Sequence, residues 1–304
     1  MKYAFVLQHL QDYSLSLACE TLGISVSGFH AWKDRPVAPR TMEQQRLLFL
    51  IKTIYHRSGG VYGAPRIDAV LREENGYDGS LARVKALMRA HGVRAKTRKK
   101  FKATTDSNHK LPIAPNLLAD EANQPSEPSQ AFVSDITYIR TQEGWLYMAA
   151  VMDLHTRAIV GWALKPRMTA ELVLDALTMA WFRRRPAPST IFHSDRGSQY
   201  ASKATRSLLA KYAMRQSMSG NGSCFDNAAM ESFWKTLKTE RVYLQKIYAT
   251  REIAKSDIVQ YVEMFYNSER LHSALAYRSP NRFECDHYRN QYAQRSANKS
   301  STKT

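Results

Sequence analysis

The sequence predicts an α/β domain preceded by all-helical modules. From residue 131, the segments AFVSDITYIR, WLYMAAVMDL and RAIVGWALK are rich in the β-branched and aromatic residues that favour strands. A helical segment, AELVLDALTMAWFRRR, and a strand-like segment, TIFHSD, come next, and further helical segments follow. Three early strands followed by alternating helices and strands are typical of a layered α/β architecture. Upstream of residue 100 the apolar periodicity is helical only.

The first module covers residues 1–36. Its apolar residues fit two short helices that cross at a tight turn, with Gly23 at the turn and the small Cys19 where the helices approach. These apolar residues are Ala18, Leu22, Ile24, Phe29 and Trp32. The spacing indicates a helix-turn-helix unit, although a plain helical hairpin has the same pattern.

The second helical module covers residues 41–110. A helical period in RTMEQQRLLFLIKTIYHRS is followed by a helix pair that is interrupted at Gly76 and ends near Gly92. The basic run RAKTRKKFK (94–102) comes next, with six basic residues and no acid. Such a run is often a solvated arm, but after a helix-turn-helix-like unit we expect it to contact phosphates. The candidate residues are Arg94, Lys96, Arg98, Lys99 and Lys100.

Residues 111–130 separate the helical modules from the α/β domain. They hold four prolines and no basic residue, which predicts a semi-extended linker. The α/β domain then runs over 131–288 and includes a helical, aromatic-rich C-terminal extension from about 252. The remaining residues, 289–304, are polar and basic, and we predict a disordered tail.

The charge balance predicts a polyanionic partner. The chain of 304 residues has 44 basic and 27 acidic residues, a net charge of +17 and a pI near 9.8. Such an excess most often serves nucleic-acid binding, because Lys and Arg release counterions from phosphates. The three cysteines lie far apart, which argues against disulfides and a structural zinc site and fits a reducing cytosol. We see no signal peptide and no apolar run of about 20 residues, so we expect no membrane association.

Three acidic residues stand where a metal site would need them. Asp135 interrupts an apolar strand, Asp195 ends another strand, and Glu231 lies on a helix after a Gly-rich loop. Carboxylates that converge in this way can hold hard divalent cations, and two Mg²⁺ ions can promote an in-line phosphoryl transfer. Each acid also has an ordinary explanation, as a strand-edge, turn or exposed helix residue. No nucleophile elbow, P-loop or HExxH motif offers another chemistry.

Four longer motifs carry a resemblance. SDITYI, HSDRGSQYAS, SMSGNGSCFDNAAMESFWKTLK and YNSERLHSALAYRSP resemble the landmarks of DDE transposases encoded by insertion sequences of the IS-three group, specifically the OrfB product. The resemblance extends over about residues 3–286. The family's signature places 35 residues between the second Asp and the Glu, and 35 residues separate Asp195 from Glu231 here.

The resemblance implies an RNase H-like fold of the retroviral integrase type. In that fold Asp135, Asp195 and Glu231 would be the metal-binding catalytic triad, with two Mg²⁺ ions or Mn²⁺ as a substitute. It implies strand cleavage and strand transfer on DNA, with terminal inverted repeats and target DNA as partners. A homo-oligomer on DNA and an OrfA partner or fusion are further expectations, as is a bacterial cytoplasmic, nucleoid-associated location.

The helix that carries Glu231 has two further candidate residues. Lys235 and Lys238 follow Glu231 by four and seven residues, so the three share one helical face. We predict that both lysines contact DNA, although a Glu231–Lys235 ion pair on the surface is the alternative. Asp226 directly precedes the helix and is predicted to cap its N-terminus.

Other polar residues have two interpretations that the sequence leaves open. Asp153 serves a hairpin turn or reaches the site, and His193 packs within its strand or faces the site. Arg270, His272 and Tyr277 contact DNA or pack the C-terminal extension onto the core. At the level of function, a catalytic transposase, a non-catalytic DNA-binding regulator and an RNase H-type nuclease that does not join strands are the three hypotheses.

Overall fold

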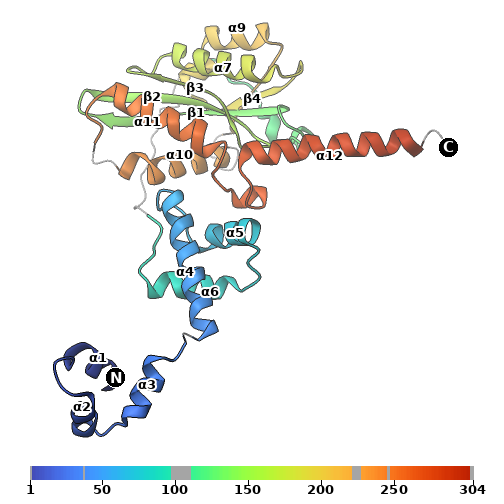
Figure 1. The fold of residues 1–304 in the computed structure, drawn as a ribbon. Helices are drawn as coiled ribbons and strands as arrows, with labels where there is room; N and C mark the ends of the chain where they lie inside the picture. Colours follow the sequence, from blue (N-terminus) through green and yellow to red (C-terminus); the bar gives the residue numbers. More distant parts are fainter. Residues whose placement is uncertain (1, 37, 97–110, 221–226, 245–246, 302–304) are drawn as a thin grey trace.

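The protein is described here by a computed structural model, which covers residues 2–36, 38–96, 111–220, 227–244 and 247–301. Three bodies follow one another along the chain (Figure 1). A small helical unit at the N-terminus is followed by a second helical module, and the α/β domain lies beyond it with its sheet covered by helices on both faces.

The N-terminal unit consists of α1 (Lys2–His9), α2 (Leu15–Leu22) and α3 (Val26–Lys33). Ser14 caps α2 and Ser25 caps α3, each accepting a hydrogen bond from a backbone N–H of the first turn. Gly23 ends α2 with a φ of 61°, a left-handed conformation that glycine adopts without strain. Buried Ala18, Cys19 and Phe29 hold the crossing helices together. The predicted turn at Gly23 is confirmed.

The second module packs α4 (Pro39–Arg57) against α5 (Ala64–Asn75) and α6 (Leu81–Ala90). Gly76 ends α5 as its left-handed C-cap, and Ser80 caps α6. The core of this module is a cluster of buried aliphatic residues, among them Ile51, Ile67, Leu71 and Val84. The three helices occur where the apolar periods predicted them.

Residues 111–130 pack more tightly than a linker. They contain two short 3₁₀ turns, η1 (Leu117–Ala119) and η2 (Glu121–Asn123). Leu118 is buried in the core of the α/β domain, and the N–H of Leu117 donates to Ser217 Oγ at 2.9 Å. The prolines keep the segment extended, while its leucines fasten it to the domain.

A five-stranded sheet forms the centre of the α/β domain, in the order β3-β2-β1-β4-β5. The first three strands are antiparallel neighbours, and β4 and β5 run parallel to β1. Their bounds are β1 (Ala131–Thr141), β2 (Gly144–Asp153), β3 (Ile159–Lys165), β4 (Ile191–Ser194) and β5 (Arg215–Met218). The strand β1 is therefore central and buried on both faces.

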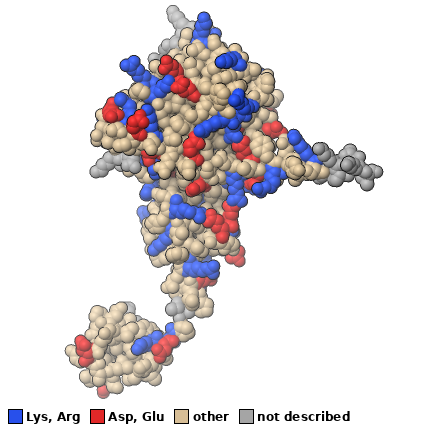
Figure 2. Space-filling view, turned by 45° about the horizontal axis from the view of Figure 1, so that its top comes forward, with Lys and Arg blue, Asp and Glu red and all other residues tan. Residues whose placement is uncertain are grey.

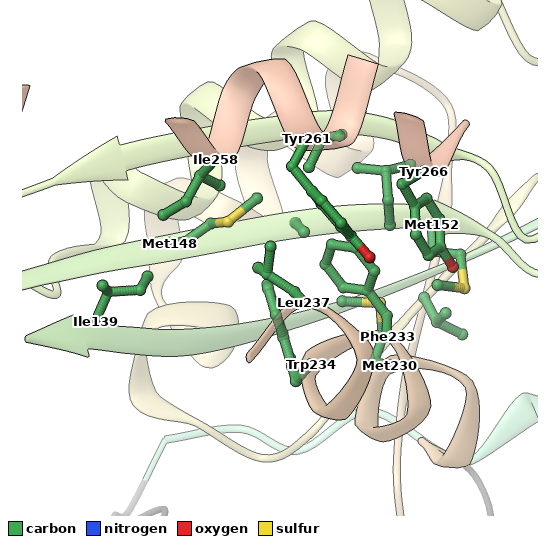
Figure 3. Close-up of a cluster of buried hydrophobic side chains, with 14 of the residues drawn as sticks. Ile139, Met148, Met152, Met230, Phe233, Trp234, Leu237, Ile258, Tyr261 and Tyr266 are labelled. Carbon is green, nitrogen blue, oxygen red and sulfur yellow. The ribbon is translucent and has the colours of Figure 1, made fainter. Parts of the chain in front are cut away.

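Helices cover the two faces of the sheet and give two cores. One face carries α7 (Ala170–Arg184), α8 (Ser198–Ala201) and α9 (Lys203–Lys211). The other carries α10 (Ala228–Glu240) and α11 (Arg251–Gln260), as Figure 1 shows. In Figure 3, apolar side chains of α10 point toward the strands and toward Tyr261 and Tyr266. These side chains are Met230, Phe233, Trp234 and Leu237.

The C-terminal extension is less regular than predicted. A short 3₁₀ turn, η3 (Val242–Leu244), follows α10, and a π-helical turn, η4 (Tyr261–Tyr266), continues α11. Turns and the 3₁₀ turn η5 (Ser273–Leu275) lead to α12 (Pro280–Ser301). The predicted disordered tail differs most, because α12 continues to Ser301. No Gly or Pro lies between Asn281 and Ser301 to end it.

None of the helices in the described ranges has the length and apolarity that a membrane span requires. On the face in Figure 2, basic and acidic side chains are interspersed, so that face has no single positive patch.

Candidate active site

Asp135 lies in the middle of the central strand β1, on the face that α10 covers. It is partly buried, and its Oδ2 accepts a hydrogen bond from Trp234 Nε1 at 2.9 Å. Its Oδ1 accepts from the N–H of Ile136 at 2.8 Å. The indole of Trp234, on α10, therefore provides the partner that an acidic residue within an apolar strand requires.

The pairing of β1 with β4 brings Asp195 beside Asp135. Ser134 is in register with Ser194, and each aspartate is the next residue along its parallel strand. Asp195 Oδ1 accepts from the N–H of Gly197 at 2.9 Å. A Cβ at position 197 would approach this oxygen to 3.0 Å, so glycine keeps the space beside the carboxylate open.

Glu231 approaches the site from α10. The helix begins at Ala228, with Asn227 at the N-cap position, and its apolar stripe packs on the sheet. Glu231 is exposed, and its charge acts on Asp135 more weakly than that of Asp195. In the part of the chain that the structure describes, no three His, Cys, Asp or Glu side chains are close enough to hold a metal ion as they stand. The two aspartates form the close pair, and Glu231 lies at its edge.

The mutual repulsion of the Asp135 and Asp195 carboxylates favours a bound cation. Burial, followed by the charge of Asp195, raises the pKa of Asp135 from 3.8 to about 7, although hydrogen bonds from Ile136 and Trp234 favour its charged form. Two carboxylates that repel each other in a partly buried place gain from a divalent ion between them. Oxygen donors of this kind suit Mg²⁺ and Mn²⁺.

The predicted DNA-contact residues have different environments. Lys235 is exposed, whereas Lys238 is half-buried with its Nζ 5.1 Å from the centroid of the Tyr138 ring. Burial lowers the pKa of Lys238, and the charge of Asp135 opposes that effect. Lys238 thus lies on the part of α10 that faces Tyr138, close enough for the charge of Asp135 to act on it.

The basic run is described only in part. Arg94 and Lys96 are exposed, but Lys96 Nζ donates to the carbonyl of Gly59 at 2.8 Å, which fastens the run to the end of α4. Arg98, Lys99 and Lys100 lie outside the described residues. Asp226, for which we predicted a capping role, also lies outside them.

The structure resolves two of the open alternatives. The carboxylate of Asp153 is buried and accepts from the N–H groups of Ser129, His155 and Thr156, so it stabilises the hairpin turn. His193 is buried within β4, where its ring nitrogens lie 2.8 Å from Ser217 Oγ and 3.1 Å from Ser219 Oγ. Asp153 therefore serves the hairpin turn, and His193 packs within its strand.

A buried ion-pair network at the end of α10 was missed from sequence. Glu240 accepts from Arg270 Nε at 2.8 Å and Nη2 at 2.7 Å, and from Tyr261 Oη at 2.8 Å. Arg66 of α5 lies 3.8 Å from the same carboxylate. The helix that carries Glu231 is thereby joined to the second helical module. A signal was present, since Glu240 continues the apolar face of an amphipathic helix.

Comparisons with known proteins match both parts of the chain. Residues 125–224 and 231–291 match two family models described as integrase core domain, and residues 42–101 match one described as HTH-like domain. The transposase InsF of insertion sequence IS3A from Escherichia coli K12 is 40% identical over 286 residues, or 93% of this chain and 98% of that protein. The chain belongs to the IS3 family of transposases. It is a DDE transposase that acts in DNA transposition and integration, and DNA is its partner.

Another relative and two solved structures are also similar to this transposase. A 31 kDa protein of insertion element IS600 from Shigella sonnei is 42% identical over 265 residues, covering 87% of this chain and 96% of that protein. Among solved structures, a simian T-cell lymphotropic virus intasome gives a TM-score of 0.45 at 12% identity, covering 77% of this chain and 74% of that one. The catalytic core of BIV integrase gives 0.41 at 15% identity, covering 54% and 99%. The integrase core, with its mixed sheet and helical N-terminal region, is the predicted RNase H-like fold.

The raised pKa of Asp135 predicts how the stability of the metal-free protein depends on pH. The folded state holds this proton more tightly than the unfolded state, so the contribution of Asp135 to stability falls as pH rises between 3.8 and about 7. Each pH unit in this window lowers the free energy of unfolding by about 1.4 kcal/mol. In chelator, D135N should therefore gain stability over the wild type with increasing pH. Denaturant titrations at pH 4 to 8 measure the difference.

Added Mg²⁺ provides the matching control. At pH 8 it should raise the melting temperature of the wild type and leave that of D135N unchanged. Parallel stability curves for the two proteins in chelator would contradict the interpretation that burial and the charge of Asp195 raise the pKa of Asp135.

Proposed function

We propose that Asp135, Asp195 and Glu231 hold two Mg²⁺ ions, which Mn²⁺ can replace, and that the transposase thereby cleaves and joins DNA at the ends of its element. The observation that carries the proposal is the β1–β4 register, which sets Asp135 beside Asp195 on the face covered by α10. When bound, such ions stabilise the charge on the attacking and leaving oxygens of a phosphoryl transfer.

The chain's own residues orient the carboxylates. Trp234 fixes one oxygen of Asp135, and the N–H of Gly197 fixes one oxygen of Asp195. The exposed Glu231 side chain has several rotamers available and can complete the set from α10. A water molecule or a DNA 3′-hydroxyl then serves as the nucleophile, so no nucleophilic side chain is required.

A strand-transfer assay with labelled element ends, target DNA and Mg²⁺ separates the three hypotheses. A transposase converts the ends into joined products, an RNase H-type nuclease only shortens them, and a regulator binds them unchanged. Binding without cleavage or joining by the wild-type chain would overturn the proposal.

The partners and location of the transposase follow the same reasoning. We infer that terminal inverted repeats and target DNA bind across α10 and the helical modules, and that the protein acts as a homo-oligomer on DNA. We also infer an OrfA partner or fusion, because this sequence has no sustained heptad repeat and a coiled coil for assembly would then come from the partner. A reducing, nucleoid-containing bacterial cytoplasm suits its widely spaced cysteines.

Reversing the charge of both Lys235 and Lys238 is expected to weaken binding of end DNA roughly 100-fold at moderate salt. Two lost phosphate contacts should also reduce the slope of log affinity against log salt by about 2. Gel-shift titrations at several salt concentrations measure both effects. Lys203→Glu on α9, an exposed lysine on the opposite side of the sheet, is the matched control. Unchanged binding by the double variant would rule out DNA contact by Lys235 and Lys238.

A further inference from the structure

A cavity of about 720 Å³ lies between the second helical module and the catalytic domain. Its walls come from α5, from residues 118–125, from the hairpin turn after β2, from α10 and from the segment that follows η4. The residues that line it include Arg66, His155, Arg157, Ser232, Thr236, Arg270 and His272. Its volume falls in the range of roughly 300–1,000 Å³ typical of ligand pockets.

The cavity has a strongly cationic lining. Three guanidinium groups and two imidazoles face it, and none of the described residues that line it is acidic. Glu240 lies just behind the wall and neutralises Arg270, with which it forms two hydrogen bonds. Burial and then the charges of Arg270, Arg66 and Arg157 lower the pKa of His272 to about 3, so the three arginines act on one place.

Arg157 is a cation of this lining without a direct partner among the described residues, although the charge of Asp153 acts on it from a distance. In the described ranges its guanidinium has no hydrogen bond and no ion pair, and burial lowers its pKa. Its backbone adopts a φ of 62°, a conformation that costs energy for a residue with a side chain. The N–H of Arg157 donates to the carbonyl of Asp153 at 2.8 Å, so the hairpin turn holds the residue there.

His155 adds a second unsatisfied donor or acceptor. Its Nε2 is buried and has no hydrogen-bond partner within the described residues. The ring packs 5.5 Å from Phe283 and 5.3 Å from His287, centroid to centroid, so α12 fixes its orientation. Buried polar atoms without partners are rare in folded proteins, so this nitrogen can take a further hydrogen bond.

The hydroxyls of α10 complete a set of donors for an oxyanion. Ser232 and Thr236 lie one turn apart on the cavity side of the helix, and the N-terminal end of the helix dipole adds positive potential. Guanidinium, imidazole and hydroxyl groups together are the usual ligands of a phosphate.

We propose that this cavity binds a phosphate group of the DNA strand on which the transposase acts. The assignment rests on the proposed function, because Ser232 directly follows Glu231 and lies about 100° from it around α10. A strand whose reacting phosphate lies at the catalytic carboxylates continues along α10 into the cavity. Arg157 and His155 then receive the anion that the fold itself does not supply.

Arg157→Asn tests the proposal with little risk to the fold, since Asn tolerates the left-handed backbone conformation. We expect end DNA to bind about tenfold more weakly in chelator, and the slope of log affinity against log salt to fall by about 1. The melting temperature should stay equal or rise, because the cation that is removed is partly buried and has no hydrogen bond or ion pair within the described ranges. A residue that serves only the fold would lower the melting temperature and leave the slope unchanged.

Two further measurements distinguish a DNA phosphate from a small phosphate ligand, and a failure of the cavity site from a failure of the proposed function. Inorganic phosphate should stabilise the wild type relative to chloride at equal ionic strength by more than it stabilises Arg157→Asn, since the general stabilisation by phosphate salts is common to both proteins. Stabilisation by phosphate with an unchanged salt slope of DNA binding would overturn the DNA assignment in favour of a small phosphate ligand.

Arg206→Asn, on the exposed side of α9, is the matched control and should change neither the salt slope of DNA binding nor the melting temperature. Absence of end binding by the wild type would refute the proposed function itself, whereas an unchanged slope for Arg157→Asn refutes only the cavity site.

Discussion

Asp135→Asn should abolish both cleavage and joining of element ends while leaving the protein folded. Asparagine has nearly the same shape, and its side-chain oxygen can still accept the hydrogen bond from Trp234 Nε1. It lacks the charge that a divalent ion needs between positions 135 and 195. Loss of several kcal/mol of charge stabilisation lowers the rate by about 1,000-fold or more, since each 1.36 kcal/mol is tenfold.

The measurement is the initial rate of cleavage and of strand transfer on labelled end DNA, with binding of the same DNA as the internal reference. Binding should persist, because the helical modules, Lys235 and Lys238 are intact. Asp175→Asn is the matched control: Asp175 is an exposed aspartate of α7 on the opposite face, where it pairs with Lys165. Retained joining by the D135N variant would exclude Asp135 from the reaction.

Much of this site was predictable because chemistry limits where an acid can stand in a strand. A carboxylate in β1 and another at the end of β4 are costly unless they serve a purpose, and the parallel pairing of these strands makes them neighbours. The amphipathic period of α10 likewise separated Phe233 and Leu237, which face the core, from Glu231 and Lys235, which do not. Local patterns determine such features.

Other features depend on contacts between distant residues and were not predictable. The strand β5 is four residues long and includes Arg215 and Gln216, so its pattern resembles a loop. It forms because β4 offers a free edge, and Ser217 of β5 lies within hydrogen-bonding distance of His193. The contacts of Arg66 with Glu240 and with the carbonyl of Leu271 join positions more than 170 residues apart. The periodicity of apolar residues along the sequence cannot predict contacts between residues so far apart.

Glu240→Met should destabilise the transposase by about 3–5 kcal/mol, the cost of leaving a buried charge without its partner. Arg270 is only 4% exposed and Glu240 only 8%, so water cannot replace the lost carboxylate. Tyr261 would lose its acceptor as well, and Arg66 would lose its attraction to α10. Denaturant titration followed by tryptophan fluorescence measures the change, because Trp234 lies on the same helix.

The double variant Glu240→Met with Arg270→Met decides what the ion pair contributes. If the cost arises from an unpaired buried guanidinium, removing both charges with side chains of similar volume should recover most of the lost stability. The exposed pair Arg57–Glu74, whose side chains are 53% and 45% accessible, provides the comparison: Glu74→Gln should cost less than about 1 kcal/mol. A double variant as unstable as Glu240→Met would mean that the hydrogen bond from Tyr261 and the approach of Arg66, rather than Arg270, make Glu240 necessary. The junction between the helical module and the catalytic helix would then depend on the carboxylate itself.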